Sequence, residues 1–316
     1  MIKHRVRSTV LPFFALATAV FSSAAHSQAA TIVDRATVTL SVEANRPYID
    51  ITFTRADGSE RKAHFLLDTG GGGFLFTEPL ARDLGLTWGD VMQEEGSEMA
   101  IVKTLPAVRI GDFSIELNPQ RIVVMIGKDN ILPERAVGRG RAEGMFPAHL
   151  LSKYHVVFDY PAATFTIAKP GVLTPRGAVF PMPVGRPSGF PRTEITVDGK
   201  TYGMLIDTGA SFTMVSDSVL KSWGDAHKDW ERHTGAFGEA ATLGGQTIET
   251  MFVPTATWAT FQIAPLGVTS QRTGTFEKYM SQMMAGPIVG SLAGNVLKHY
   301  RLELDYANQK LYVSEK

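Results

Sequence analysis

Two strings 139 residues apart share a pattern of apolar residues followed by Asp-Thr-Gly. The first runs from His64 to Gly70 and contains Asp68, and the second runs from Gly203 to Gly209 and contains Asp207. Self-similarity over a long frame indicates that one structural unit occurs twice in the chain. This duplication restricts the fold more than any other feature of the sequence, because both halves must follow one plan.

A helical pattern follows each string. Nine residues after each Asp comes a residue that favours helix N-caps, Thr77 or Ser216, and seventeen residues after each Asp comes a glycine, Gly85 or Gly224. An N-cap residue, an acidic first turn and a closing glycine are typical of a short helix. We therefore predict one short helix in each half, ending at its glycine.

The two halves also end alike. Tyr154 and Asp159 recur as Tyr300 and Asp305, 146 residues later, so the second half carries seven additional residues between the repeated blocks. A surface loop tolerates an insertion of this size. Each end predicts a short helix and a β-hairpin. The predicted hairpin strands are 156–158 with 165–167, and 302–304 with 311–313.

The remainder is dominated by short β-like runs, so the chain is predicted to be mainly β with two lobes. Six prolines between Lys169 and Pro191 exclude a regular helix or central strand there and indicate an extended connector. The predicted organisation is a signal peptide at 1–29, an N-terminal lobe at 30–168, the connector at 169–191 and a C-terminal lobe at 192–316. The clearest further strand candidates are 37–42, 48–53, 122–126 and 193–197.

The first thirty residues have the pattern of a secretory signal. Positive charges at Lys3, Arg5 and Arg7 precede the apolar run Val10–Phe21, and small residues follow it. The run is shorter than the roughly 20 residues that a transmembrane helix needs, which disfavours a permanent membrane anchor. We expect export to the periplasm or the medium, with cleavage between positions 25 and 29. An uncleaved N-terminal anchor is the alternative.

Composition narrows the classes of function. Lys plus Arg and Asp plus Glu both number 31, so the basic excess typical of nucleic-acid binders is missing. The chain has no Cys, which excludes disulfides, a thiol nucleophile and a thiolate zinc site. The histidines lack the spacing of a metal site, so we expect neither a metal nor a cofactor.

The two Asp-Thr-Gly turns are the candidate chemical centre. A single copy has a simple structural interpretation, since Asp and Gly suit turns. An Asp that directly follows a buried strand is costly unless it is paired, and a symmetry-related Asp is the natural partner. Two carboxyl groups about 3 Å apart share one proton. The charged one can take a proton from water while the neutral one donates to a substrate carbonyl oxygen.

These motifs resemble those of the aspartic protease superfamily, especially bacterial retropepsin-like proteases with two fused copies. The pattern of two apolar residues followed by Asp-Thr-Gly-Ala-Ser is complete from Leu205 to Ser211, and Ile288-Val289-Gly290 matches the second signature. The resemblance covers about 35–314. It implies a bilobal pepsin-like or retropepsin-like β fold, a cleft between the lobes and a polypeptide substrate. The residues that it implicates are Asp68 and Asp207 as the catalytic pair, Thr69, Gly70, Thr208 and Gly209 as support, and Ser211 beside Asp207.

The first half departs from the family pattern at two positions. Gly72 stands where the family usually has a hydroxyl residue, and the charged Glu143 stands where an apolar residue is expected. The segment that covers the substrate is not assigned by the sequence. Candidates are 96–104 and 234–245.

Three functions remain open at this point. The first is an aspartic endopeptidase, which we expect to be a monomer because duplication supplies both halves of the site. The second is a degenerate relative that binds extended peptides without cleaving them. The third is a purely structural two-lobed module, in which Asp68 and Asp207 would lie too far apart to share a proton.

Overall fold

The structure is a computed structural model that describes residues 33–94, 97–117, 122–132, 140–237, 247–271 and 274–315. The predicted signal peptide at 1–29 lies outside the described residues. The described parts of both predicted lobes lie within one unit, Val33–Lys316. Over the described ranges, every helix is too short or too polar to cross a membrane.

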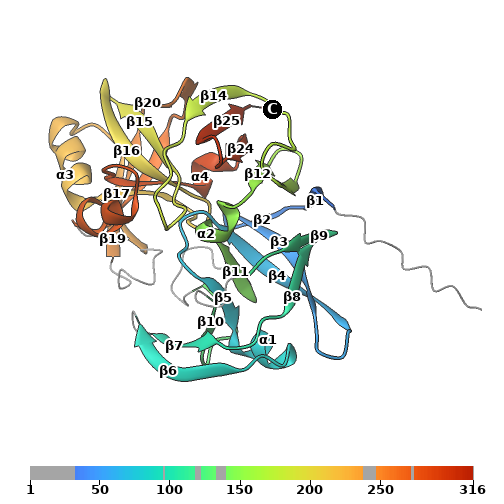
Figure 1. Ribbon diagram of the computed structural model, residues 1–316. Helices are drawn as coiled ribbons and strands as arrows, with labels where there is room; N and C mark the ends of the chain where they lie inside the picture. Colours follow the sequence, from blue (N-terminus) through green and yellow to red (C-terminus); the bar gives the residue numbers. More distant parts are fainter. Residues whose placement is uncertain are drawn as a thin grey trace, which may run out of the picture. The chain divides into compact units, whose positions relative to one another are not determined.

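In the first half, a ten-stranded sheet carries the first Asp-Thr-Gly turn. Its strand order is β6-β7-β10-β5-β11-β4-β3-β8-β9, with β2 paired to β3 outside this path. In Figure 1 most of these strands are blue to green. The strands are β2 (Ser41–Glu43), β3 (Arg46–Thr54), β4 (Glu60–Asp68), β5 (Phe74–Thr77), β6 (Trp88–Glu94), β7 (Ser97–Val102), β8 (Ala107–Ile110), β9 (Phe113–Ile115), β10 (Ile122–Met125) and β11 (Gly144–Pro147).

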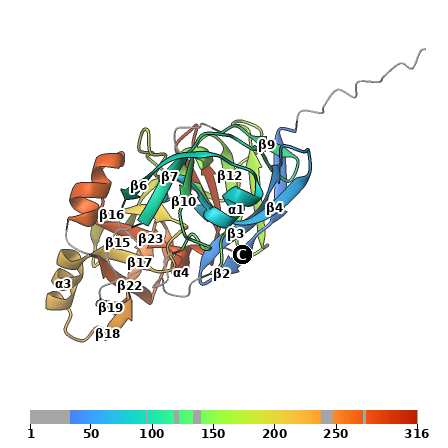
Figure 2. The ribbon, with the colours of Figure 1, turned by 90° about the horizontal axis from the view of Figure 1, so that it is seen from below.

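The second half repeats this sheet. The order β18-β19-β22-β17-β23-β16-β15-β20-β21 matches that of the first half strand for strand. Figure 2 shows β15, β16, β17, β22 and β23 grouped in this sheet. The strands are β15 (Arg192–Val197), β16 (Lys200–Asp207), β17 (Thr213–Ser216), β18 (Arg232–Phe237), β19 (Thr247–Val253), β20 (Ala256–Trp258), β21 (Phe261–Gln262), β22 (Leu266–Gln271) and β23 (Gly290–Ala293).

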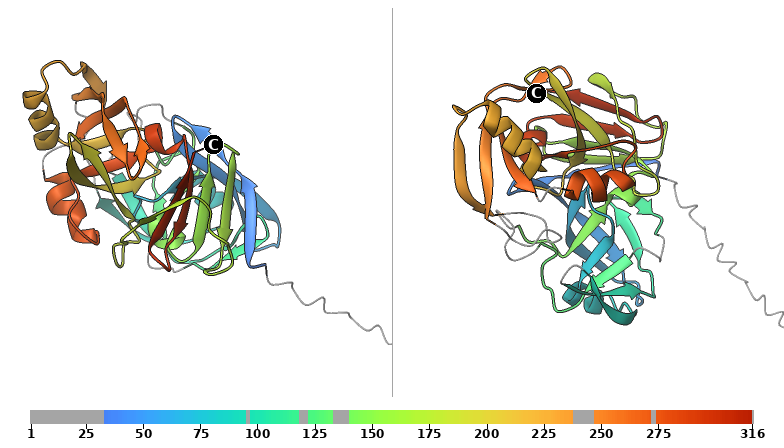
Figure 3. Two further views of the ribbon diagram at one scale, coloured as in Figure 1. Left: turned by 90° about the horizontal axis from the view of Figure 1, so that it is seen from above. Right: turned by 90° about the vertical axis from the view of Figure 1, so that its left-hand side faces the viewer.

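A six-stranded sheet joins the halves, in the order β1-β13-β12-β24-β25-β14. Both views of Figure 3 show its green strands beside its dark red strands. The strands are β1 (Arg35–Thr39), β12 (His155–Asp159), β13 (Thr164–Ala168), β14 (Ala178–Pro181), β24 (Arg301–Asp305) and β25 (Lys310–Ser314). The two hairpins predicted from the sequence are therefore the centre of this sheet, and the proline-rich connector contributes only its edge strand, β14.

The register of this sheet reveals the internal symmetry. β12 pairs with β24 so that Val157 lies opposite Glu303. These two positions are equivalents in the halves, 146 residues apart, so a pseudo-twofold axis passes between them. One apolar cluster extends through both halves and includes Phe65, Val156 and Leu302. The shared sheet and this shared core hold the halves in one arrangement, which fixes where the two repeated turns meet.

Short helices follow the repeated turns. α1 (Glu78–Asp83) and α3 (Asp217–Ala226) begin after Thr77 and Ser216 as predicted, although neither side chain makes a capping hydrogen bond. The remaining helices are α2 (Ala148–Leu151), α4 (Gly294–Leu297), the π-helix η3 (Thr275–Tyr279) and the 3-10 helix η4 (Met280–Met283).

One predicted helix end is wrong. Gly85 follows α1 in the left-handed conformation with φ +67°, as expected. Gly224, by contrast, lies inside α3, which continues to Ala226. A Cβ at Gly224 would lie 2.6 Å from the guanidinium group of Arg232, which also donates a hydrogen bond to the Gly224 carbonyl oxygen. The glycine therefore makes room for an arginine and does not end the helix.

A buried ion pair lies next to the pseudo-twofold axis. The His155 Nε2 and Glu303 Oε1 atoms are 2.8 Å apart, and both side chains are 1% exposed. Arg301 contacts the other carboxylate oxygen at 2.7 Å. Burial acts to raise the pKa of Glu303, but hydrogen bonds from His155, Arg301 and the Arg176 backbone outweigh burial and hold this pKa below its ordinary value.

We predict that Glu303→Gln lowers the free energy of unfolding by about 3 kcal/mol at pH 7, because it breaks a buried pair. A carboxyl whose folded-state pKa is depressed stabilises the fold above its unfolded pKa, and this contribution is lost as the pH falls. The difference from wild type should therefore narrow below about pH 4. Urea titrations at pH 7 and pH 3.5 measure both effects.

The control is Glu60→Gln, which removes an exposed ion pair with Arg109. It should cost less than about 1 kcal/mol. A similarly small loss for Glu303→Gln, or a loss that does not change with pH, would contradict the assignment of this pair as a buried link between the halves.

Candidate active site

Each repeated turn is held at the end of a buried parallel strand pair. β4 lies parallel to β11 and ends at Asp68; β16 lies parallel to β23 and ends at Asp207. The residues Phe65, Leu66 and Leu67 that precede Asp68 are at most 1% exposed. Apolar residues thus fix both faces of the strand, and the chain turns where the first carboxylate appears.

The two turns contact each other through their threonines. The backbone N–H of Thr69 donates to Thr208 Oγ1 at 3.0 Å, and the backbone N–H of Thr208 donates to Thr69 Oγ1 at 3.0 Å. Each hydroxyl in turn donates across the junction, from Thr69 to the Ile206 carbonyl at 2.6 Å and from Thr208 to the Leu67 carbonyl at 2.7 Å. Both threonines are fully buried. These four bonds lock the two turns together.

The two carboxyl groups meet in this junction. The Asp68 carboxyl group lies against Gly209 of the second turn, and the Asp207 carboxyl group lies against Gly70 of the first. A Cβ on Gly70 would lie 2.8 Å from the Asp207 Cγ, and a Cβ on Gly209 would lie 2.2 Å from the Asp68 Cγ. Only glycine leaves room for each carboxyl group to lie against the opposite turn. The structure thus brings together the residues that the sequence predicts, and the wide separation required by a purely structural module is not observed.

Backbone N–H groups bind both carboxylates in matching ways. Gly70 N–H donates to Asp68 Oδ1 at 2.8 Å, and Gly209 N–H donates to Asp207 Oδ1 at 3.1 Å. Ala210 N–H adds a second bond to Asp207 Oδ1 at 3.1 Å. Donors fixed by the turns hold the carboxyl groups in position and favour their charged form.

Burial raises the pKa of Asp68 above its ordinary value. Hydrogen bonds from Gly70 and Gly71, the positive charge of Arg46 and the contact with Asp207 oppose this effect without cancelling it. A raised pKa in one member of a touching pair is the condition under which the two groups hold one proton between them.

Two residues near the pair were given no role at the site by the sequence analysis. The first is Arg46, whose side chain is 1% exposed. The second is Tyr160, whose pKa is raised by burial and also by the charge of Asp207. Among the described residues, the Tyr160 hydroxyl has no hydrogen-bond partner. Arg46 carries no repeated motif. Tyr160 does recur, as Tyr306 in the Asp-Tyr pairs at 159–160 and 305–306, and that repetition is a signal that could have drawn attention to it.

The two positions that follow the turns differ between the halves. Ser211 is 1% exposed, and its carbonyl accepts hydrogen bonds from Asn45 Nδ2 at 3.1 Å and from the Asn295 N–H at 2.9 Å. Its equivalent, Gly72, is exposed, and a Cβ built there meets no atom within 4 Å. There is therefore room for a serine side chain at position 72.

Glu143 does not pack beside the first turn as an apolar residue would. Its carboxylate forms an ion pair with Arg61 and accepts a hydrogen bond from the His64 N–H at 3.1 Å. The neighbouring Gly144 keeps its role, because a Cβ there would lie 2.1 Å from the Phe65 ring. The charge that departs from the family pattern is therefore paired with Arg61 at the edge of the site.

The candidate covering segments lie in equivalent places. The range 96–104 includes β7, which pairs with β6 at the edge of the first sheet. The range 234–245 includes part of β18, which pairs with β19 at the edge of the second sheet. Residues 96 and 238–245 lie outside the described residues, so the choice between the two candidates stays a prediction.

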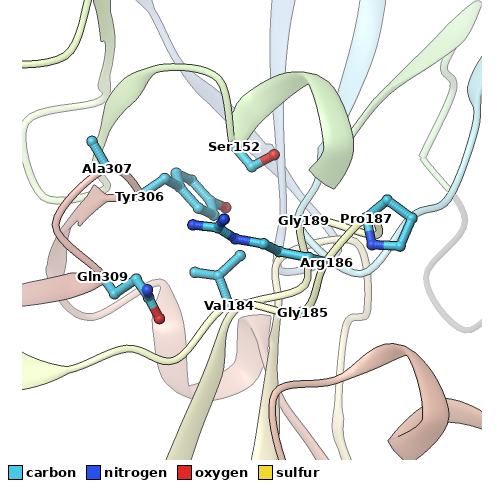
Figure 4. A pocket seen from close by; sticks show the side chains of 9 residues that line it. All are labelled: Ser152, Val184, Gly185, Arg186, Pro187, Gly189, Tyr306, Ala307 and Gln309. Carbon is cyan, nitrogen blue, oxygen red and sulfur yellow. The ribbon is translucent and has the colours of Figure 1, made fainter.

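A separate pocket lies where the connector meets the end of α2 and the β24–β25 turn. Its volume is about 260 Å³. Figure 4 shows the side chains of Arg186, Tyr306 and Gln309 around it, and neither Asp68 nor Asp207 lines it. In the described part of the chain, no three His, Asp or Glu side chains gather in a way that could hold a metal ion.

We predict that Gly72→Ser folds normally and gains up to about 1 kcal/mol of stability, because a side chain fits and the unfolded chain loses freedom. Gly70→Ala is the matched control within the same turn. Its Cβ would collide with the Asp207 carboxyl, so it should cost about 1–3 kcal/mol. Thermal unfolding of both variants measures the difference. Equal stabilities of the two variants would contradict the close approach of Gly70 to the Asp207 carboxyl group.

Two comparisons with known proteins bear on the family and the fold. A model of the aspartyl protease family matches residues 193–274, which include Asp207 and its turn. Among solved structures, the chain is similar to the aspartic proteinase from Irpex lacteus, with a TM-score of 0.53 and 12% identity over 89% of this chain and 97% of that chain. At this identity the similarity establishes the fold. A search of curated protein sequences found no significant match.

The prediction of a mainly β, bilobal fold is confirmed by this structural match. The family match lies within the second half of the chain and ends at residue 274, whereas the shared fold covers both halves. The chain is thus similar to an aspartyl protease family over 193–274 and shares the fold of an aspartic proteinase over most of its length.

Proposed function

We propose that this protein is an aspartic endopeptidase in which Asp68 and Asp207 activate a water molecule for attack on a peptide bond. The observation that carries the proposal is the position of each carboxyl group against the glycine of the opposite turn, in a junction that the two threonines hold closed. A half-buried carboxyl pair of this kind holds one proton and one negative charge over a broad pH range. Aspartic proteases in general use such a pair as acid and base, because two carboxyl groups in contact cannot both ionise.

The proposed reaction needs only these two groups and water. The charged carboxylate takes one proton from the water while the water oxygen bonds to the carbonyl carbon of the peptide. At the same time the neutral carboxyl group gives its proton to the carbonyl oxygen. In the second step a proton moves to the amide nitrogen, the C–N bond breaks, and an acid and an amine leave. No covalent intermediate with the protein forms and no cofactor takes part.

The supporting residues act on geometry. Thr69 and Thr208 hold the two turns at a fixed distance through their reciprocal bonds. Gly70 and Gly209 allow the approach of the carboxyl groups. We assign Ser211 to the positioning of Asp207. Because one chain supplies both halves of the site, the proposal needs only a monomer.

We further propose that the protein is exported and acts in the periplasm or the medium. The proposal rests on the signal-like pattern of 1–29. Expression of the full chain with its own N-terminus, followed by cell fractionation and N-terminal sequencing, tests it. We expect a mature N-terminus between positions 26 and 30 in the exported fraction. A full-length chain in the cytoplasmic fraction would contradict export.

We predict that Asp207→Asn keeps the fold and abolishes peptide cleavage, because the neutral amide can neither take a proton from water nor share one. The assay incubates purified protein with a peptide library between pH 3 and pH 7 and identifies new termini by mass spectrometry. Loss of at least about 1000-fold is expected, since the acid–base pair carries most of the chemistry.

The control is Asp57→Asn, which changes an aspartate of the β3–β4 turn that is bonded to Ser59. It should cleave like the wild type. Cleavage by Asp207→Asn at the wild-type rate would refute the proposal. Peptide binding by the wild-type protein without new termini at any pH would favour the second candidate, a peptide-binding relative, which the missing hydroxyl at Gly72 favours.

A further inference from the structure

A fully buried arginine connects the first half to the turn of the second half. Arg46 begins β3, and its side chain is 1% exposed. Its Nε donates to the carbonyl oxygen of Gly209 at 2.8 Å. The Asp68 carboxyl group packs against the Cα atom of this same Gly209. The arginine therefore holds the backbone against which the first carboxyl group packs.

The internal duplication shows that this arginine is not required by the fold. Strand register places Tyr48 opposite Leu66 in the first half and Arg192 opposite Leu205 in the second. Counting back two residues, the equivalent of Arg46 is Phe190, which is 3% exposed and packs in an apolar cluster with Ala148. The same structural position thus accepts an apolar side chain in one half and a cation in the other.

A buried cation at this position has a large energetic cost unless an anion lies near it. The carboxyl pair provides that anion, since the positive charge of Arg46 acts on Asp68. One arginine and one shared negative charge thus offset each other at this junction. A second arginine, at the position of Phe190, would leave an excess positive charge.

We propose that Arg46 is a positioning residue of the Asp68–Asp207 pair, which holds the second turn through Gly209 and supplies the fixed positive charge that sets the pH range in which the pair carries one negative charge. This inference rests on the proposed function, because it assigns a residue to the same site. It makes the two halves of the site electrically unequal although their backbones match.

Other charged or titratable groups surround the same region. Tyr160, from the turn after β12, has a pKa that is raised by burial and by the charge of Asp207, so it stays neutral. Glu43 lies opposite Arg46 in the β2–β3 hairpin and contacts His64 at 3.4 Å. Lys298, after α4, donates to Asn45 Oδ1 at 2.8 Å. Of these groups, Lys298 offers a second cation near Arg46 and serves as a control.

The test measures kcat/KM against pH for wild type, Arg46→Met, Arg46→Lys and Lys298→Met. Loss of the cation makes the first ionisation of the pair harder, so Arg46→Met should move the acidic limb to higher pH, by on the order of one pH unit. Arg46→Lys keeps the charge and should restore most of the wild-type profile. Lys298→Met should leave the profile in place.

An unchanged profile in Arg46→Met would overturn the proposal. So would equal displacements in Arg46→Met and Arg46→Lys, which would point to packing, or an equal displacement in Lys298→Met, which would point to overall charge.

A stability measurement separates failure of this inference from failure of the proposed function. The cost of Arg46→Met in the unfolding equilibrium is compared, at pH 6, between wild type and a chain that carries Asp68→Asn together with Asp207→Asn. In the wild-type background, where the arginine has its anion, we expect Arg46→Met to raise the unfolding equilibrium constant by a factor on the order of tenfold greater than in the double-Asn background. Phe190→Leu is the matched control and should cost the same in both backgrounds.

The two readouts then give distinct results. A protein that cleaves no peptide but shows the coupling would defeat the proposed function and retain Arg46 as the counter-charge of the pair. A protein that cleaves peptides but shows neither the coupling nor the pH displacement would retain the proposed function and refute the role of Arg46.

Discussion

The exchange of hydrogen bonds between Thr69 and Thr208 is the constraint on which the rest of the structure depends. Each threonine donates its backbone N–H to the other's hydroxyl and its own hydroxyl to the opposite strand. Such buried bonds are costly to leave unmade, so separating the turns would orphan several polar groups at once. The neighbouring aspartates are thereby forced together, against the electrostatic preference of two acids to stay apart.

The six-stranded sheet also fixes how the two halves are placed relative to each other. Its register sets a pseudo-twofold axis between Val157 and Glu303, and the threonine exchange has the same symmetry. A buried ion pair of His155 and Glu303 stands beside the axis in the sheet. Two separate sets of contacts, the shared sheet and the hydrogen-bonded turns, therefore hold the halves together. Both restrict the relative movement of the two carboxyl groups.

Several departures from symmetry lie around the site. Arg46 and Phe190 occupy equivalent positions with different charge, and Gly72 and Ser211 differ in one hydroxyl. Glu143 replaces an apolar residue but is neutralised by Arg61 at the edge. The backbone frame is common to both halves, whereas the chemical environment of each carboxyl is its own. Duplication alone would produce a symmetric site, and these substitutions give Asp68 and Asp207 different surroundings.

Much of this fold could be predicted from the sequence, because the offsets of 139 and 146 residues mark equivalent strands and turns. Repetition identified Asp68 and Asp207, and it identified the hairpins of the shared sheet. Gly224 misled the prediction because a glycine that makes room for Arg232 looks the same as one that ends a helix. Arg46 was missed for a related reason: its importance comes from a contact with Gly209, 163 residues away, and its equivalent is Phe190.

The titration of the two carboxyl groups tests the central claim most directly. Carbon-13 NMR of aspartate Cγ atoms, assigned with Asp68→Asn and Asp207→Asn, follows both groups from pH 2 to pH 9. If the turns meet as described, both signals change together in two well-separated steps, because the pair holds its last proton in common. Two independent single steps near the ordinary aspartate pKa of about 3.9 would contradict the account.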